Sequence, residues 1–225
     1  MFTGIIEAIG TVKAIDINSQ GARLKIATNN LNMSDVKLGD SIATNGICLT
    51  VIDYTQTSFS ADVSNETLKR TGFADYQVGM QVNLEKAMLA STRFGGHMVS
   101  GHVDGISEIL SVINNGNSIE YWLSIPSDLA HYIAEKGSVT IDGTSLTVNA
   151  LSDDASQEKF RLTIVPHTVK ETIFANYQVG SKVNLEVDLI ARYLERLLTK
   201  NTTVEMSTTK SNVTETMLQQ AGFIK

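Results

Sequence analysis

An internal repeat constrains this chain more than any other feature of its sequence. The stretch Ser41–Val51, SIATNGICLTV, returns 97 positions later as Ser138–Val148, SVTIDGTSLTV. The only cysteine of the chain, Cys48, is replaced by Ser145 in the second stretch. A repeat of this kind predicts two copies of one structural module, with a common scaffold and different pocket chemistry.

A second pair of similar segments defines the extent of the repeat. Glu66–Glu85 and His167–Glu186 are identical at 13 of 20 positions, at an offset of 101. The second copy therefore carries four extra residues, and the polar run Asn149–Lys159 predicts a longer hairpin loop there. At the start of the chain, Phe2-Thr3-Gly4 aligns with Val99-Ser100-Gly101. We predict modules over residues 1–97 and 98–187, a helix over 188–200 and a polar tail over 201–225.

The segments within a module are short, rich in Val, Ile and Thr, and bounded by Gly, Asn and Asp. Such segments indicate an all-β barrel or sandwich; in the first module they are Ile5–Ile15, Arg23–Ala27, Ile47–Tyr54, Ser58–Val63 and Val82–Lys86. Three Asx-Gly pairs predict tight turns, namely Asn45-Gly46, Asn115-Gly116 and Asp142-Gly143. Helices are expected to be few and brief, with about two turns each at Ser64–Thr71 and Pro126–Glu135.

The pattern changes near the C-terminus. Apolar side chains at helical spacing form a stripe there, made of Ile190, Tyr193, Leu194, Leu197 and Leu198. Spacing favours two interpretations equally: the helix caps the second module, or it mediates self-association.

Composition excludes several classes of protein. The chain has 225 residues, of which 42% are hydrophobic and 19% charged. This length and composition are typical of a globular protein with two domains. A net charge of -6 without a basic stripe argues against nucleic-acid and membrane partners. One cysteine forms no internal disulfide, and neither a secretory signal nor a membrane span is present, so we expect a cytoplasmic protein. The four histidines lack zinc-site spacing, and we expect no metal.

Cys48 is the first candidate for chemistry. A lone cysteine is usually a small buried residue, but strand alternation places Cys48 and Thr50 on one face, and Ser145 and Thr147 on the matching face of the second copy. Small polar residues repeated on one face suit the wall of a pocket. His102 is a second candidate, since it stands where the first copy has an apolar residue.

Other polar positions have a structural and a functional interpretation. Ser64 and Thr67, like Pro166 and Thr168, follow a strand and begin a helix, where hydroxyls either cap the helix or hold a ligand. Asp188 begins the last helix, where the helix dipole favours a carboxylate in any case. No phosphate loop, dinucleotide fingerprint or nucleophile elbow occurs. Spacing alone predicts a two-module protein that binds a planar, hydrogen-bonding ligand.

Several motifs together are similar to those of the riboflavin synthase family, in its bacterial and plant type. The matching pieces are the opening MFTGI, the NGICLTV stretch, the paired VNLE strands, GGHMVSGHVDG at 95–105, Lys136-Gly with DGTSLTVN at 142–149, and Pro166-His-Thr168. The resemblance covers about residues 1–200 and implies two six-stranded Greek-key β-barrels followed by a C-terminal α-helix. It implies a cofactor-free dismutation of two 6,7-dimethyl-8-ribityllumazine molecules to riboflavin and 5-amino-6-ribitylaminouracil.

The resemblance also implies a set of site residues. Catalytic roles fall on Ser41, Cys48 and His102; substrate contacts fall on Phe2, Thr3, Gly4, Thr50, Ser64, Thr67, His97, Gly101, Lys136, Asp142, Ser145, Thr147, Pro166, Thr168 and Asp188. In this family the productive site forms between the N-terminal barrel of one subunit and the C-terminal barrel of its neighbour in a homotrimer, which favours assembly as the role of the last helix. The sequence carries no signal for association with lumazine synthase.

Two rival functions use the same fold. Lumazine and yellow fluorescent proteins resemble this family and hold one ligand as an optical antenna without turnover. A structural protein with empty pockets is the plainer alternative. Both copies here keep the polar positions, which favours the enzyme.

Overall fold

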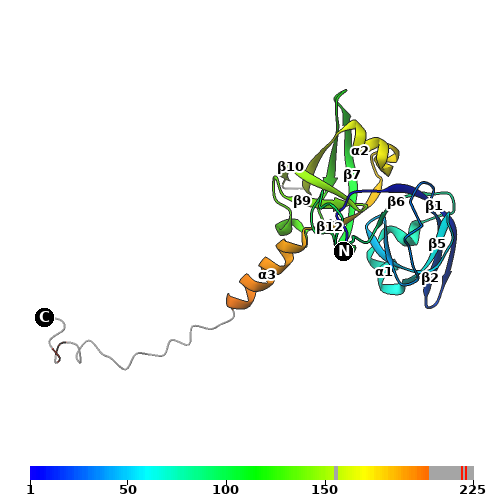
Figure 1. Cartoon of the computed structure of the whole chain (residues 1–225). Coiled ribbons are helices and arrows are strands. Elements are labelled where there is room, and N and C mark those ends of the chain that lie inside the picture. Colours follow the sequence, from blue (N-terminus) through cyan, green and yellow to red (C-terminus); the bar gives the residue numbers. More distant parts are fainter. Residues whose placement is uncertain (155–156, 203–218, 220, 222–225) are drawn as a thin grey trace. The chain divides into compact units, whose positions relative to one another are not determined.

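The computed structural model describes residues 1–154, 157–202, 219 and 221. Two closed barrels of six antiparallel strands account for most of the described chain (Figure 1). The first barrel is made of β1 (Ala8–Asn18), β2 (Gly21–Ala27), β3 (Ser41–Thr44), β4 (Ile47–Tyr54), β5 (Ser58–Ser64) and β6 (Gln81–Lys86). The second is made of β7 (Gly105–Asn114), β8 (Ile119–Ser124), β9 (Ser138–Ile141), β10 (Thr144–Asp154), β11 (Gln157–Ile164) and β12 (Lys182–Val187).

Both barrels have one topology. The strand order is β1-β2-β5-β4-β3-β6 in the first, and the second repeats it with β7-β8-β11-β10-β9-β12. Three consecutive hairpin-connected strands with the preceding strand beside the last of them form a Greek key. The predicted fold class is therefore confirmed.

The interior of each barrel is filled with apolar side chains. In the first barrel, Ile47, Leu49 and Val51 of β4 point inward and are almost fully buried. Since strand side chains alternate, Cys48 and Thr50 lie on the outer wall. Leu146 and Val148 of β10 contact the second core in the same way. A ligand of either barrel must therefore bind outside the barrel wall.

Two of the three predicted Asx-Gly turns form two-residue hairpin loops, whereas Asn115-Gly116 lies in a longer loop between β7 and β8. Asn45 and Gly46 have φ of 46° and 77°, and Asp142 and Gly143 have φ of 42° and 82°. Two positive φ angles in a two-residue hairpin loop match the twist of the flanking strands. The two loops also meet: a Cβ on Gly46 would lie 2.7 Å from the backbone nitrogen of Gly143, so only glycine fits this close approach.

The short helices agree only in part with the sequence. Helices α1 (Asn65–Arg70) and α2 (Pro166–Glu171) follow β5 and β11 as expected. Ser64 caps α1 by accepting a hydrogen bond from the Thr67 backbone N–H, whereas α2 has no side-chain cap. The 3-10 helices η1 (Gly72–Asp75) and η3 (Ile173–Asn176) follow them.

The prediction of a helix over Pro126–Glu135 is wrong. Only the 3-10 turn η2 (Ala130–Tyr132) forms there. The backbone bonds run from residue i+3 to residue i, for example from Leu129 N to Pro126 O and from Ile133 N to Ala130 O. These tight turns bury both Leu129 and Ile133 in the second core. Tertiary packing thus overrides the local helical pattern.

The prediction of a longer hairpin loop in the second copy is also wrong. β10 has 11 residues where β4 has 8, and β11 has 8 where β5 has 7. Pairing continues to Asp154 and Gln157 at the end of the hairpin. The four extra residues lengthen two paired strands instead of a loop.

Helix α3 (Leu189–Thr202) carries the predicted apolar stripe. Its side chains are exposed, with fractions of 55% at Ile190, 64% at Tyr193, 54% at Leu194, 63% at Leu197 and 70% at Leu198. The polar tail predicted over 201–225 lies mostly outside the described residues. Among the helices that the structure describes, none has the length and apolar character to cross a membrane.

Candidate functional site: two outer walls and a shared joint

Two short segments outside the barrels complete the candidate site. The first is residues 2–5 and the second is residues 99–102. They pair with each other through an antiparallel bridge between Phe2 and Val99, with backbone N···O distances of 2.8 and 3.2 Å. Phe2 is fully buried and packs with Ala43, Val99 and Cys48.

Each segment is hydrogen-bonded to the outer wall of one barrel. The backbone N–H of Cys48 donates to the carbonyl of Gly101 at 2.9 Å, and the N–H of Ser145 donates to the carbonyl of Gly4 at 2.8 Å. The contacts leave no room for a side chain on either glycine, because an added Cβ would lie 2.7 Å from Cys48 Cβ and 2.5 Å from Ser145 Cβ. Their φ angles of 79° and 76° also favour glycine.

The wall of the first barrel carries Cys48 and several of the other predicted polar residues. Ser41 of β3 lies opposite Thr50 of β4, and Cys48 lies opposite Ala43. Cys48 is a free, partly buried thiol, and Thr50 is exposed. His102 is exposed and follows the residue that contacts Cys48. Ser64 and Thr67 lie at the start of α1, with their hydroxyl oxygens 3.0 Å apart.

The wall of the second barrel has the same plan with different chemistry. Ser138 lies opposite Thr147, and Thr140 lies opposite Ser145. The His97 Nδ1 lies 2.7 Å from Ser145 Oγ, and its Nε2 lies 3.2 Å from Thr140 Oγ1. An imidazole therefore contacts the serine that replaces the cysteine.

The electrostatics of His97 follow from its burial. Burial lowers the pKa of the imidazole, and the charge of Asp188 partly opposes this shift. Since the ordinary value is already below 7, the ring is neutral at pH 7. One ring nitrogen then donates and the other accepts, so His97 orients both hydroxyls that it contacts.

The remaining residues predicted for the second wall lie in three other segments. Lys136 is exposed, has a φ of 66°, and its backbone N–H donates to Val148 O just before β9. Pro166 and Thr168 lie in α2. Asp188 accepts a hydrogen bond from the N–H of Ile190 at 2.9 Å, which is the structural role considered for it.

Asp142 lies elsewhere. Its carboxylate accepts hydrogen bonds from the Tyr177 hydroxyl and from the Asn184 N–H, the latter at 2.9 Å, in a buried joint between the barrels. Asn45 has the equivalent partners in the first barrel: its Oδ1 accepts from the Asn83 N–H at 2.7 Å, and its Nδ2 donates to the Tyr76 hydroxyl at 2.6 Å. Burial raises the pKa of Asp142 to about 7.

The joint contains residues that sequence reasoning missed. The Asn83 side chain donates to Asp142 O and accepts from the Ile173 N–H, both at 2.9 Å. The Asn184 side chain donates to Asn45 O and accepts from the Gly72 N–H, also at 2.9 Å. Each asparagine thus bonds the other barrel. A hollow of ≈ 470 Å³ adjoins this joint; its lining includes Tyr76, Tyr177 and Asp142 but neither Cys48 nor Ser145.

A signal for these residues was present in the repeat. The VNLE strands keep Asn and Glu at alternate positions in both copies, at Asn83 and Glu85 and at Asn184 and Glu186. Alternation places them on the outer wall, opposite the core residues Val82 and Leu84. All four are buried, at 4% exposure or less. Polar residues that are identical in both copies on an outer face indicate a face covered by another element.

Comparison with known proteins agrees with this geometry. A family model described as the lumazine binding domain matches residues 3–87 and again 100–188. The riboflavin synthase of Photobacterium phosphoreum is 51% identical over 224 residues, which cover 100% of both chains. The riboflavin synthase of Bacillus subtilis (strain 168) is 44% identical over 223 residues, 99% of this chain and 100% of that protein.

Solved structures share the fold at lower identity. LumP complexed with 6,7-dimethyl-8-(1'-D-ribityl) lumazine superposes with a TM-score of 0.73 at 23% identity, covering 83% of this chain and 99% of LumP. LumP complexed with riboflavin gives a TM-score of 0.75 at 24% identity with the same coverage. These likenesses show the fold. Together with the two family matches and the full-length relatives, they lead to one conclusion: the chain belongs to the riboflavin synthase family of proteins with two lumazine-binding repeats.

Proposed function

We propose that this chain is a riboflavin synthase. It would transfer a four-carbon unit between two molecules of 6,7-dimethyl-8-ribityllumazine, giving riboflavin and 5-amino-6-ribitylaminouracil. The observation that carries the proposal is the 51% identity to a riboflavin synthase over the whole length of both chains, since it includes both repeats and both outer walls.

The duplicated walls suit a reaction between two identical substrates. One lumazine donates carbon atoms and the other accepts them, so two related pockets must differ in chemistry. Cys48 and Ser145 occupy equivalent places, yet only Ser145 has an imidazole within hydrogen-bond distance, at 2.7 Å. This difference supports unequal tasks for the two walls.

The chemistry makes modest demands on acids and bases. The C7 methyl group of the lumazine loses a proton to give a delocalised anion, which the ring system itself stabilises. Aligning two ring systems is the larger demand. When binding already holds the two reactants in the right orientation, the reaction step loses little further entropy, which can lower its free-energy barrier by up to about 7–11 kcal/mol. The site residues therefore act first by positioning.

In the first barrel the proposed site consists of the wall around Cys48. Phe2 lies next to the ring stack, and Cys48 and His102 are the candidates for moving the C7 proton or adding to C7. The other proposed contacts at this wall are Ser41, Thr50, Ser64, Thr67 and Gly101. Thr3 and Gly4 belong to the segment that contacts the wall around Ser145 and are proposed contacts there. The support is the grouping of Ser41, Cys48 and Thr50 on adjacent strands.

In the second barrel the proposed site consists of the wall around Ser145. His97 orients the Ser145 hydroxyl, and Lys136, Thr147, Pro166, Thr168 and Asp188 complete the pocket. We leave Asp142 out of this pocket, since its carboxylate is engaged by Tyr177 and Asn184 in the joint.

The proposal includes a homotrimer in which the first barrel of one subunit faces the second barrel of the next. Its support is the exposed apolar stripe on α3, since large exposed apolar surfaces indicate contact with a partner. The functional units are residues 1–97, 98–187 and the helix 188–200. A cytoplasmic location is part of the proposal, supported by the single free thiol.

Incubating the purified full chain with 6,7-dimethyl-8-ribityllumazine tests the proposal. Equal amounts of riboflavin and 5-amino-6-ribitylaminouracil, measured by chromatography, are expected without any added cofactor. Tight fluorescent binding without turnover would instead support an antenna of the LumP kind. Neither turnover nor binding would leave only a structural role.

A further inference from the structure

Two buried glutamates hold the short segments beside the barrel walls. Glu85 of β6 accepts hydrogen bonds from Thr3 N, Thr3 Oγ1 and Gly4 N at 2.7, 2.7 and 2.9 Å. Glu186 of β12 accepts from Ser100 N, Ser100 Oγ and Gly101 N at 2.6, 2.7 and 3.1 Å. The two copies therefore repeat one arrangement, in which a carboxylate receives two backbone N–H groups and one hydroxyl.

The arrangement crosses between the barrels. Glu186 belongs to the second barrel, but the segment that it holds contacts the first barrel, where the Cys48 N–H donates to Gly101 O. Glu85 belongs to the first barrel, but its segment contacts the second barrel, where the Ser145 N–H donates to Gly4 O. Each outer wall is thus completed by a segment that the other barrel anchors.

The energetics favour a tight hold. A buried carboxylate is costly unless hydrogen bonds compensate its lost hydration, and hydrogen bonds to charged groups are about twice as strong as neutral ones. Glu85 and Glu186 are only 4% and 3% exposed. Burial raises the pKa of Glu186 to about 7, and the bonds from Ser100 and Gly101 oppose that rise. An amide has one acceptor oxygen and would turn its NH2 group toward an N–H donor, so replacing either carboxylate by an amide should loosen the segment.

We propose that Glu85 and Glu186 are positioning residues that act across the barrels, each fixing the segment that forms part of the opposite barrel's pocket wall. Glu186 holds Gly101 and the adjoining His102 beside Cys48, and Glu85 holds Gly4 beside Ser145. The assignment of these walls as pockets rests on the proposed function. The claim that each glutamate fixes the segment of the opposite barrel rests only on the observed contacts, and it can be tested without measuring riboflavin formation.

The single cysteine provides that test. In the wild-type chain, the rate at which Cys48 reacts with an aromatic disulfide reagent reports on the cover provided by Gly101. Glu186→Gln should raise this rate about tenfold, because the amide cannot accept from all three donors and the segment opens more often. Glu85→Gln should raise it less than about threefold, since Glu85 holds the other segment.

Exchanging the two wall residues reverses the experiment. In the background Cys48→Ser with Ser145→Cys, each barrel carries the residue natural to the other, and the only thiol now lies beside Gly4. Glu85→Gln should then give the larger rise in thiol reactivity and Glu186→Gln the smaller. If each glutamate instead acts on its own barrel, the order will be the opposite in both backgrounds, and the proposal fails.

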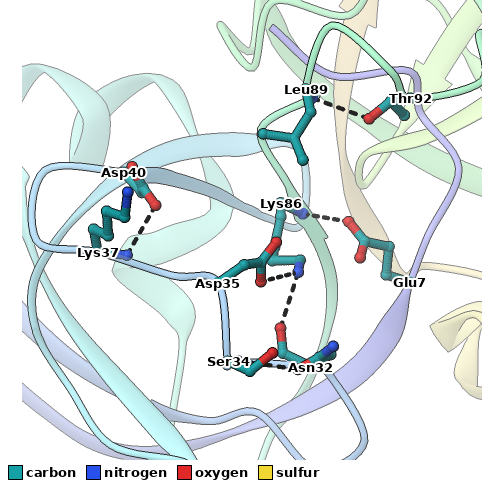
Figure 2. A network of polar contacts seen from close by, with 9 residues as sticks. All are labelled: Glu7, Asn32, Ser34, Asp35, Lys37, Asp40, Lys86, Leu89 and Thr92. Atoms are coloured by element: carbon teal, nitrogen blue, oxygen red, sulfur yellow. Dashed lines mark hydrogen bonds and ion pairs between the residues drawn. The ribbon is translucent and has the colours of Figure 1, made fainter.

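Control variants separate positioning from loss of structure. Asp40 also accepts a backbone N–H, from Lys37 at 2.9 Å, but it is exposed and this bond stays within one loop (Figure 2). Asp40→Asn should leave both thiol rates unchanged. Ser100→Ala removes one donor and keeps the carboxylate, so it should raise Cys48 reactivity about twofold even if Glu186→Gln does not fold. Equal rises for Glu85→Gln and Glu186→Gln in both backgrounds would indicate general loosening and overturn the proposal.

Discussion

At the scale of single residues, Cys48 and Ser145 define the difference between the two walls. Cys48 lies on the outer wall, so its loss leaves the inner core of Ile47, Leu49 and Val51 intact. We predict that Cys48→Ala lowers riboflavin formation by about 100-fold or more, the usual size of a proton-transfer contribution. The free energy of unfolding should change by less than about 1 kcal/mol. Wild-type turnover of the variant would remove Cys48 from the mechanism.

Asp142 and Asn45 permit a second test at the same scale. The folded-state pKa of Asp142, about 7, is above its unfolded value of 3.8. The folded chain thus binds the proton more tightly, and the stability gained in the protonated form is lost as the pH rises from about 4 through 7. Asn cannot ionise, and Asn45 shows that an amide fits the equivalent place, where its Oδ1 accepts from a backbone N–H and its Nδ2 donates to the tyrosine hydroxyl.

Asp142→Asn should therefore stabilise the chain increasingly as the pH rises. We expect the free energy of unfolding to exceed that of the wild type by on the order of 1–3 kcal/mol at pH 8, and by much less at pH 4.5. Urea titrations at several pH values measure this difference. Asn45→Asp is the matched variant and should be destabilised most at pH 8. A pH-independent difference between Asp142→Asn and the wild type would contradict this account.

At the scale of elements, α3 presents its stripe without any counterpart in the repeat. Burying a Leu side chain contributes about 1.5–3 kcal/mol, so the loss of two is large for an association between subunits. Leu194→Gln combined with Leu197→Gln should shift the chain to a monomer in sedimentation velocity. Riboflavin formation should fall with it, since the proposed site forms between subunits. Arg196→Gln, on the same helix, is the control and should keep the wild-type mass.

A truncated chain that ends at Val187 tests the same assembly role by removing helix α3 altogether. It retains all twelve strands and the Glu186 carboxylate, but it also loses Asp188, whose charge acts on His97. A monomer with little activity is expected. An active oligomer that lacks α3 would refute the assembly role.

Most elements could be predicted from the sequence because their signals are local. Alternation and the Asx-Gly turns predicted β4 with its observed bounds, Ile47–Tyr54. The failures came from tertiary structure. Leu129 and Ile133 have helical spacing, but the second core buries both without a helix. The first strand begins at Ala8 rather than Ile5, and before it Phe2 forms an isolated bridge with Val99 while Gly4 O accepts from Ser145 N.

At the scale of the whole molecule, the site could be predicted only as far as the repeat aligned it. The repeat predicted that Cys48 and Ser145 are equivalent, and they are. It did not reveal that Asn45 and Asp142 face each other's barrels across a joint, because a sequence repeat shows what two modules share and not how they pack. That packing includes Asn83, Asn184, Glu85 and Glu186. Alignment of the repeats alone does not show which barrel each of these side chains contacts.

The joint should make the barrels unfold as one unit. Asn83 and Asn184 each satisfy two backbone groups of the other barrel, and each buried group left without a partner costs about 1–3 kcal/mol. Replacing both by Ala removes four such bonds but leaves both cores intact. In differential scanning calorimetry at fixed chain concentration, we predict that the wild type gives one transition. In the double variant, the van't Hoff enthalpy should fall below the calorimetric enthalpy as the barrels separate. Asn149→Ala, which removes a bond from Thr163 N within the second barrel, should lower the midpoint without splitting the transition. A single two-state transition in the double variant would show that the crossed segments alone couple the barrels.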